Sequence, residues 1–157
     1  MLKLRENGDV KMKLDYRKTW DMRTGLLMAA VGAMLSLAFR VLYYWMGIDG
    51  YQNVEQQLTA DKTLGILAVE LVVLSPIIEE VLFRGCLYRL LRKRGSAVSS
   101  ALLSSVAFGI YHWNIPQGIY AFVMGLFLAW SLEQYQTMKA PIVIHMAANM
   151  MALIISI

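Results

Sequence analysis

The alternation of long apolar stretches with short polar segments predicts a series of membrane-spanning helices. Several of these stretches approach the length of about 20 residues that an α-helix needs to cross a bilayer. About five spans are predicted, covering residues 25–47, 64–91, 97–111, 118–132 and 141–157. The pattern therefore indicates an all-α fold, a polytopic transmembrane helix bundle.

The N-terminal residues have a different character, because they are polar and carry charges of both signs. We interpret residues 1–23 as a cytoplasmic or interfacial segment and residues 24–157 as the membrane domain. The stretch "KMKLDYRKTW" suits a short helix lying on an anionic membrane surface. The apolar stretch that follows is long and has no clear cleavage site, so we do not expect a cleaved signal peptide.

The composition supports a membrane protein and excludes other classes. The chain is 58% hydrophobic and 17% charged, with a mean hydropathy of +0.50, which is too apolar for a soluble domain of 157 residues. A single cysteine, Cys86, excludes an intrachain disulfide and a cysteine-built zinc site. The net charge of +4 arises largely from basic clusters that flank the spans, so we expect a lipid bilayer rather than nucleic acid as the partner.

The charges of the loops predict the orientation of the bundle. The acidic loop at residues 48–62 is placed outside and the basic stretch "RLLRKRGS" inside, so the N-terminus is cytoplasmic. Four aromatic residues then suit an outer interfacial belt: Tyr43, Tyr44, Trp45 and Trp113.

The third span carries small residues at every fourth position, which permits close approach of another helix. Phe108 and His112 lie beside this ridge. Its members are Ala97, Ala101, Ser105 and Gly109.

The stretch "IIEEVLFRG" places charges inside an apolar span, where they are costly and usually functional. Residues four apart share a helix face, so Glu80 is predicted to pair with Arg84. Glu79 points elsewhere, is expected to have no local partner, and is therefore a candidate general base. Pro76 lacks an amide hydrogen and is expected to free a backbone carbonyl near this carboxylate.

The chain contains two histidines, His112 and His145, and both lie in or at the end of apolar spans. Glu79 and His112 are each about 25 Å from the turn between the second and third spans, so they share a height. His145 has Asn149 on its helix face. It reaches the same height only if the preceding hairpin protrudes by about 15 Å.

Together these residues form a candidate site in which Glu79 takes a proton from water. The histidines and Asn149 would orient that water or stabilise an oxyanion. A zinc ion held by Glu79, His112 and His145 is the alternative way to activate water. A structural ion pair, a helix-end histidine and an interhelical hydrogen bond remain open as simpler interpretations.

Three short motifs carry a resemblance to a known family. "EEVLFR" at 79–84 matches an EExxxR motif, "FGIYH" at 108–112 an FxxxH motif, and "HMAAN" at 145–149 an HxxxN motif. In this order they resemble the CAAX protease and bacteriocin-processing family, also called CPBP or Abi, over residues 64–157.

The resemblance implies an intramembrane endopeptidase that cleaves a membrane-associated protein or peptide, in a bacterial cytoplasmic membrane. Its implied catalytic residues are Glu79, His112, His145 and Asn149. Its implied supporting residues are Glu80, Arg84 and Phe108. No cofactor is favoured, and a divalent metal such as zinc is the alternative.

Two other functions stay open from the sequence. One is a non-catalytic membrane protein of the same fold that acts in bacteriocin immunity or partner binding. The other is ion or solute transport, because carboxylates inside membranes also mark proton paths.

Arg40 and Glu70 are equally far from the middle of the outer loop, which predicts a salt bridge between the first two spans.

Overall fold

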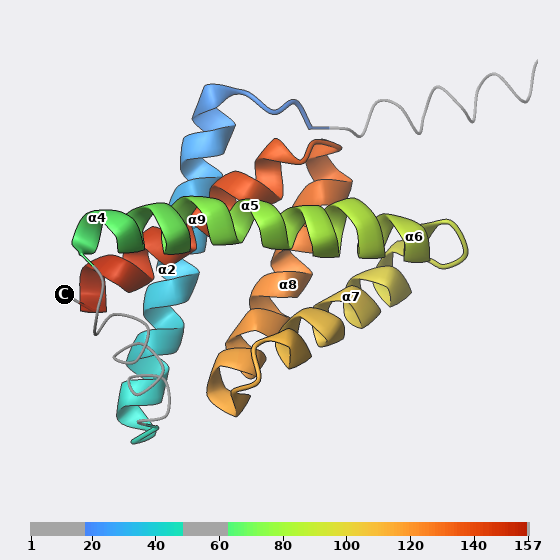
Figure 1. Ribbon diagram of the computed structural model, residues 1–157. Helices are drawn as coiled ribbons and strands as arrows, with labels where there is room; N and C mark the ends of the chain where they lie inside the picture. Colours follow the sequence, from blue (N-terminus) through green and yellow to red (C-terminus); the bar gives the residue numbers. More distant parts are fainter. Residues whose placement is uncertain (1–17, 49–62, 157) are drawn as a thin grey trace, which may run out of the picture.

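The computed structural model describes residues 18–48 and 63–156, and every regular element within them is a helix (Figure 1). Most of the N-terminal segment and of the outer loop, both interpreted above, lies outside the described residues. The all-α prediction is confirmed, and the helices match the predicted spans to within about three residues. They are α2 (Met22–Trp45), a long second helix at 64–92, α7 (Ala97–Tyr111), α8 (Ile115–Tyr135) and α9 (Lys139–Ser156).

Two of the described helices, α2 and α8, are long and apolar enough to cross a membrane. The helices α7 and α9 are also apolar but shorter. Many large apolar side chains face outward, among them Leu26 at 68% and Ile110 at 67% exposure. An outer surface of this kind fits a hydrocarbon environment, since soluble proteins rarely expose such extended apolar area.

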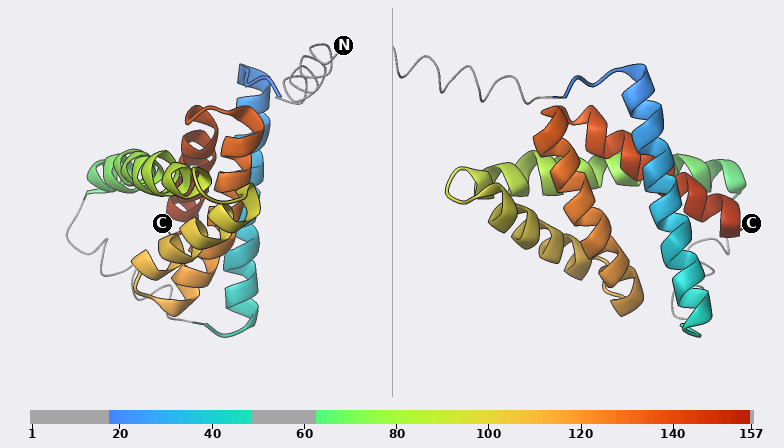
Figure 2. Two further views of the ribbon diagram at one scale, coloured as in Figure 1. Left: turned by 90° about the vertical axis from the view of Figure 1, so that its right-hand side faces the viewer. Right: turned by 180° about the vertical axis from the view of Figure 1, so that it is seen from behind.

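The second helix is continuous, but its hydrogen bonding passes twice from α-helical to π-helical geometry and back. Its segments are α4 (Leu64–Leu67), η1 (Ala68–Leu74), α5 (Ser75–Glu80), η2 (Val81–Tyr88) and α6 (Arg89–Arg92), with η1 and η2 in π-helical geometry. Figures 1 and 2 show this helix running across the direction of α2 and α8. It turns at residues 93–96, as predicted, and α7 leaves that turn at an angle to it.

The first span packs against the last one through a close backbone approach. A Cβ atom added at Gly32 in α2 would lie 2.6 Å from the backbone oxygen of Ile144 in α9. Only glycine permits this contact, so α2 crosses directly over the helix that carries His145. The start of α2 is capped by Asp21, whose side chain accepts a hydrogen bond from the backbone N–H of Thr24 at 2.7 Å.

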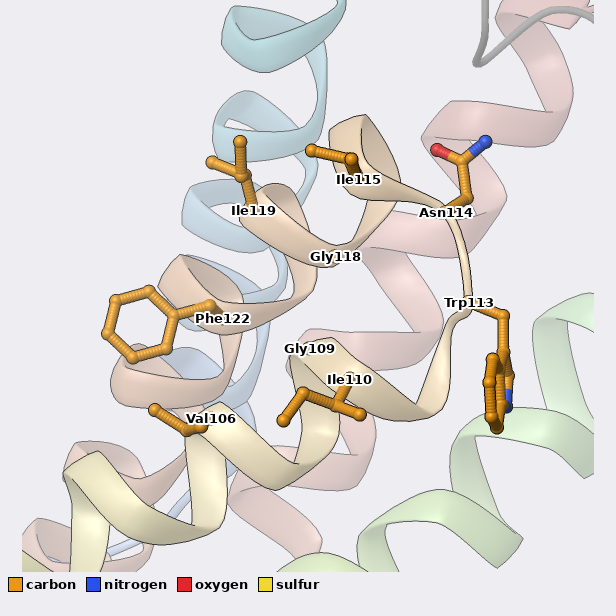
Figure 3. Close-up of a pocket in the computed structure, with 9 residues that line it drawn as sticks. All are labelled: Val106, Gly109, Ile110, Trp113, Asn114, Ile115, Gly118, Ile119 and Phe122. Carbon is orange, nitrogen blue, oxygen red and sulfur yellow. The ribbon is translucent and has the colours of Figure 1, made fainter.

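The ridge of small residues on α7 packs against α8, as predicted. A Cβ at Gly109 would meet the Gly118 oxygen at 2.7 Å, and one at Gly125 would meet the Ser105 hydroxyl at 2.9 Å. Figure 3 shows Gly109 and Gly118 at the junction of the two helices, beside an apolar hollow of about 400 Å³. The connecting residue Trp113 has a positive φ of 53°, in the left-handed region.

Three of the four residues predicted to form an outer aromatic belt are exposed, and their place at a membrane interface stays a prediction. Tyr44, Trp45 and Trp113 are exposed by 78%, 81% and 92%. Tyr43 is buried, and its hydroxyl donates a hydrogen bond to the backbone oxygen of Pro116 at 2.6 Å. The prediction for Tyr43 was wrong because neighbouring helix residues point about 100° apart.

Candidate active site

The site begins with a backbone irregularity in the second helix. The N–H of Ser75 donates five residues back, to the oxygen of Glu70, which is a π-helical bond. The same register would direct the next amide to Leu71, but Pro76 has no amide hydrogen. The Leu71 oxygen instead accepts a hydrogen bond from Asn149 Nδ2 at 2.8 Å. The expected free carbonyl is therefore present and binds a predicted site residue.

One turn further on, Glu80 pairs with Arg84 as predicted. Arg84 Nη1 donates to Glu80 Oε1 at 3.2 Å, and both side chains are fully buried. The Arg84 guanidinium lies over the ring of Phe108, 4.4 Å from its centroid. This cation–π contact helps to hold a buried charge and gives Phe108 a supporting position.

Glu79 is also buried but has a partner that the sequence reading missed. Ser75 Oγ donates a hydrogen bond to Glu79 Oε1 at 2.6 Å. The expectation that Glu79 lacks a local partner was therefore wrong. The i,i+4 spacing that linked Glu80 to Arg84 was available here too, since Ser75 lies one turn before Glu79.

His145 on α9 lies between the two glutamates. Its Nδ1 is 2.9 Å from Glu80 Oε1, and its Nε2 is 3.7 Å from Glu79 Oε2. An ionised carboxylate only accepts hydrogen bonds, so Nδ1 carries a proton and donates it toward Glu80. Glu80 thereby fixes the ring with Nε2 directed at Glu79.

His112 joins the site less directly than predicted. Its Nδ1 donates to the Phe108 backbone oxygen at 2.9 Å, and its ring meets the Phe108 ring edge-on at a centroid distance of 4.9 Å. Phe108 makes a similar contact with His145 at 5.7 Å. Within the described residues, His112 has no hydrogen bond or ion pair with either glutamate. Phe108 therefore connects the two histidines.

The described residues do not form a metal-binding group. No set of three or more His, Cys, Asp and Glu side chains in this part of the chain is arranged to hold an ion. The ligand set considered above, Glu79 with His112 and His145, is not gathered into such a group, and a metal-dependent mechanism stays an untested alternative.

A helical membrane domain in which a histidine lies between two buried glutamates is a candidate membrane hydrolase. The comparisons with known proteins support this class. A family model described as Rce1-like, type II CAAX prenyl endopeptidase, matches residues 62–151. The chain belongs to this family, and the match includes every candidate site residue. The resemblance inferred from the three motifs is thereby confirmed.

One curated relative is a Bacillus subtilis (strain 168) protein named "Putative membrane peptidase YdiL". It is 25% identical over 138 residues, which is 84% of this chain and 57% of the relative. The chain thus spans little more than half the length of that relative. No solved structure gives a significant match.

Proposed function

We propose that the protein is an intramembrane endopeptidase of a bacterial cytoplasmic membrane, in which Glu79 activates water to cleave a membrane-associated protein or peptide. The observation that carries the proposal is the position of His145 between Glu79 and Glu80. A packing device would not require a histidine nitrogen directed at a second, buried carboxylate. Membership of a peptidase family supports the same reaction class.

In the proposed reaction, Ser75 occupies Oε1 of Glu79 and leaves Oε2 for the attacking water. Glu79 takes one proton from that water, and the oxygen bonds to the scissile carbonyl carbon. Breaking of the C–N bond then returns the proton from Glu79 to the departing amine. The reaction consumes one water and needs no other reactant.

Asn149 would stabilise the negative oxygen of the tetrahedral intermediate, because it has a second N–H beyond the one bound to Leu71. His145 and His112 each donate their Nδ1 proton to an oxygen of this chain, so Nε2 of each ring is an acceptor. Nε2 of His145 would orient the attacking water beside Glu79, and His112 would contact the substrate from the far side of the Phe108 ring.

We favour a mechanism without a metal, supported by the lack of a metal-binding group among the described residues.

The decisive experiment compares Glu79→Gln with wild type and with Glu133→Gln, a carboxylate change outside the site. Each full-length protein is reconstituted with farnesylated and non-prenylated reporter peptides and with bacterial membrane proteins, and new N-termini are identified by mass spectrometry. Glu79→Gln should lower cleavage by about 10²- to 10⁴-fold, because glutamine cannot accept the proton. Wild-type cleavage by folded Glu79→Gln protein would refute the proposal and favour a non-catalytic role.

A further inference from the structure

A polar pocket of about 390 Å³ lies away from the candidate active site, between the end of the second helix and the end of α8. Three of its lining residues are basic and one is acidic. The lining residues are Tyr88, Arg89, Arg92, Lys93, Leu132, Glu133 and Gln136.

The single acidic group in the pocket is already neutralised. Glu133 Oε1 accepts hydrogen bonds from Arg92 Nε at 2.5 Å and from the Tyr88 hydroxyl at 2.6 Å. Arg92 also donates to the backbone oxygen of Gly95 at 3.0 Å. These bonds fix one wall of the pocket and leave Glu133 unable to balance a further cation.

Two cations in the pocket have no such partner. Arg89 and Lys93 are four residues apart, so they share one face of the helix end, and both are exposed. Neither makes an ion pair or a side-chain hydrogen bond within the described part of the chain. The pocket thus presents about two uncompensated positive charges beside a fixed polar wall.

The end of α8 in the pocket is also fixed. Gln136 follows α8 in the left-handed conformation, with φ at 52°, and its side chain donates a hydrogen bond to the backbone oxygen of Glu133 at 2.8 Å. A left-handed residue commonly ends a helix, and here it holds Gln136 in place beside the pocket.

The pocket lies at the end of the bundle where α2 begins. The ring of Trp20, just before α2, meets the ring of Tyr135 at the end of α8 at 5.1 Å. The charges of the loops predict that this end lies on the cytoplasmic side, where anionic lipids attract basic side chains. Leu90, next to Arg89, is 59% exposed and offers apolar surface beside the charges.

We propose that this pocket binds the phosphate of an anionic phospholipid headgroup from the inner leaflet. Arg89 and Lys93 contact the phosphate oxygens, Arg92 stays in the fixed wall beside them, and acyl chains lie along the apolar surface at Leu90. A soluble phosphate ester has the same recognition chemistry, but the adjoining apolar surface favours the lipid.

The test measures thermal unfolding of the full-length protein in a non-ionic detergent as phosphatidylglycerol, phosphatidylcholine or inorganic phosphate is added. The pocket variant is Arg89→Gln with Lys93→Gln. The control variant, Arg94→Gln with Lys139→Gln, also removes two exposed cations but none that lines the pocket. Both are surface changes, so both proteins should unfold at the wild-type temperature without lipid.

Phosphatidylglycerol should raise the unfolding temperature of wild type and of the control variant in a saturable manner. Its apparent affinity for the pocket variant should be about 25-fold weaker, about fivefold for each charge removed. The single variant Arg89→Gln should give the intermediate value.

Three results would overturn the proposal. Equal lipid affinity in the pocket variant and wild type would show that the pocket does not bind the headgroup. Equal losses in both double variants would show only diffuse surface charge. Equal stabilisation by phosphatidylcholine, or by inorganic phosphate, would reject an anionic lipid as the ligand.

Discussion

Glu80→Gln should destabilise the protein much more than Glu79→Gln, although both changes replace a buried carboxylate by a side chain of the same shape. Glu80 is fully buried and faces two nitrogen-bearing partners, Arg84 at 3.2 Å and His145 at 2.9 Å. Removing one member of a buried ion pair costs about 3–5 kcal/mol, because the other charge stays buried. In a chain of 157 residues this corresponds to a fall of about 6–20 °C in Tm.

Glu79→Gln should cost about 1 kcal/mol or less, since glutamine still accepts the Ser75 hydrogen bond. Arg84→Met combined with Glu80→Gln should recover much of the lost stability, because no unpaired buried charge remains. The measurement is denaturant unfolding in detergent micelles, followed by tryptophan fluorescence. Equal losses for the two single glutamine variants, or no recovery in the double variant, would refute the reasoning.

Gly32→Ala should destabilise the packing of α2 on α9 by about 2 kcal/mol or more, because its Cβ would lie 2.6 Å from the backbone oxygen of Ile144. The control is Gly65→Ala, whose added Cβ would have no atom within 4 Å. In the same unfolding assay this control should be neutral or stabilising. Elemental analysis should find no stoichiometric zinc in active protein, and loss of zinc together with activity under a chelator would contradict the metal-free mechanism. The predicted pairing of Arg40 with Glu70 is tested by a charge swap: Arg40→Glu with Glu70→Arg should recover stability that each single change loses, and no recovery would exclude the pair.

Contacts within one helix were predictable from spacing alone. The Glu80–Arg84 pair and the common face of His145 and Asn149 both follow from the 3.6-residue repeat. The Ser75–Glu79 bond has the same i,i+4 spacing, but it was not predicted, because a serine hydroxyl carries no charge to mark it as a partner. Helix limits were also predictable, since apolar stretches end at polar or turn-forming residues.

Contacts between helices were less predictable, because they depend on crossing angles that spacing does not determine. The spans are not the antiparallel rods that equal distances from a turn require, because the second helix runs across its neighbours (Figure 1). His145 therefore meets both glutamates directly, and His112 meets them only through Phe108. The contact between His145 and Glu80 had no signal in the sequence, since it joins residues 65 positions apart.

One oxygen, Glu80 Oε1, bonds to both Arg84 and His145, whereas the polar partners of Glu79 among the described residues are Ser75 and His145. Substitution should therefore be tolerated differently at the two neighbouring glutamates. If the proposed function is correct, a relative that does not cleave peptides is free to replace Glu79 but still needs Glu80 to keep its fold. We expect inactive relatives to retain Glu80 and Arg84 while varying at Glu79. The residue at position 79 would then distinguish active proteases from inactive relatives in sequence surveys.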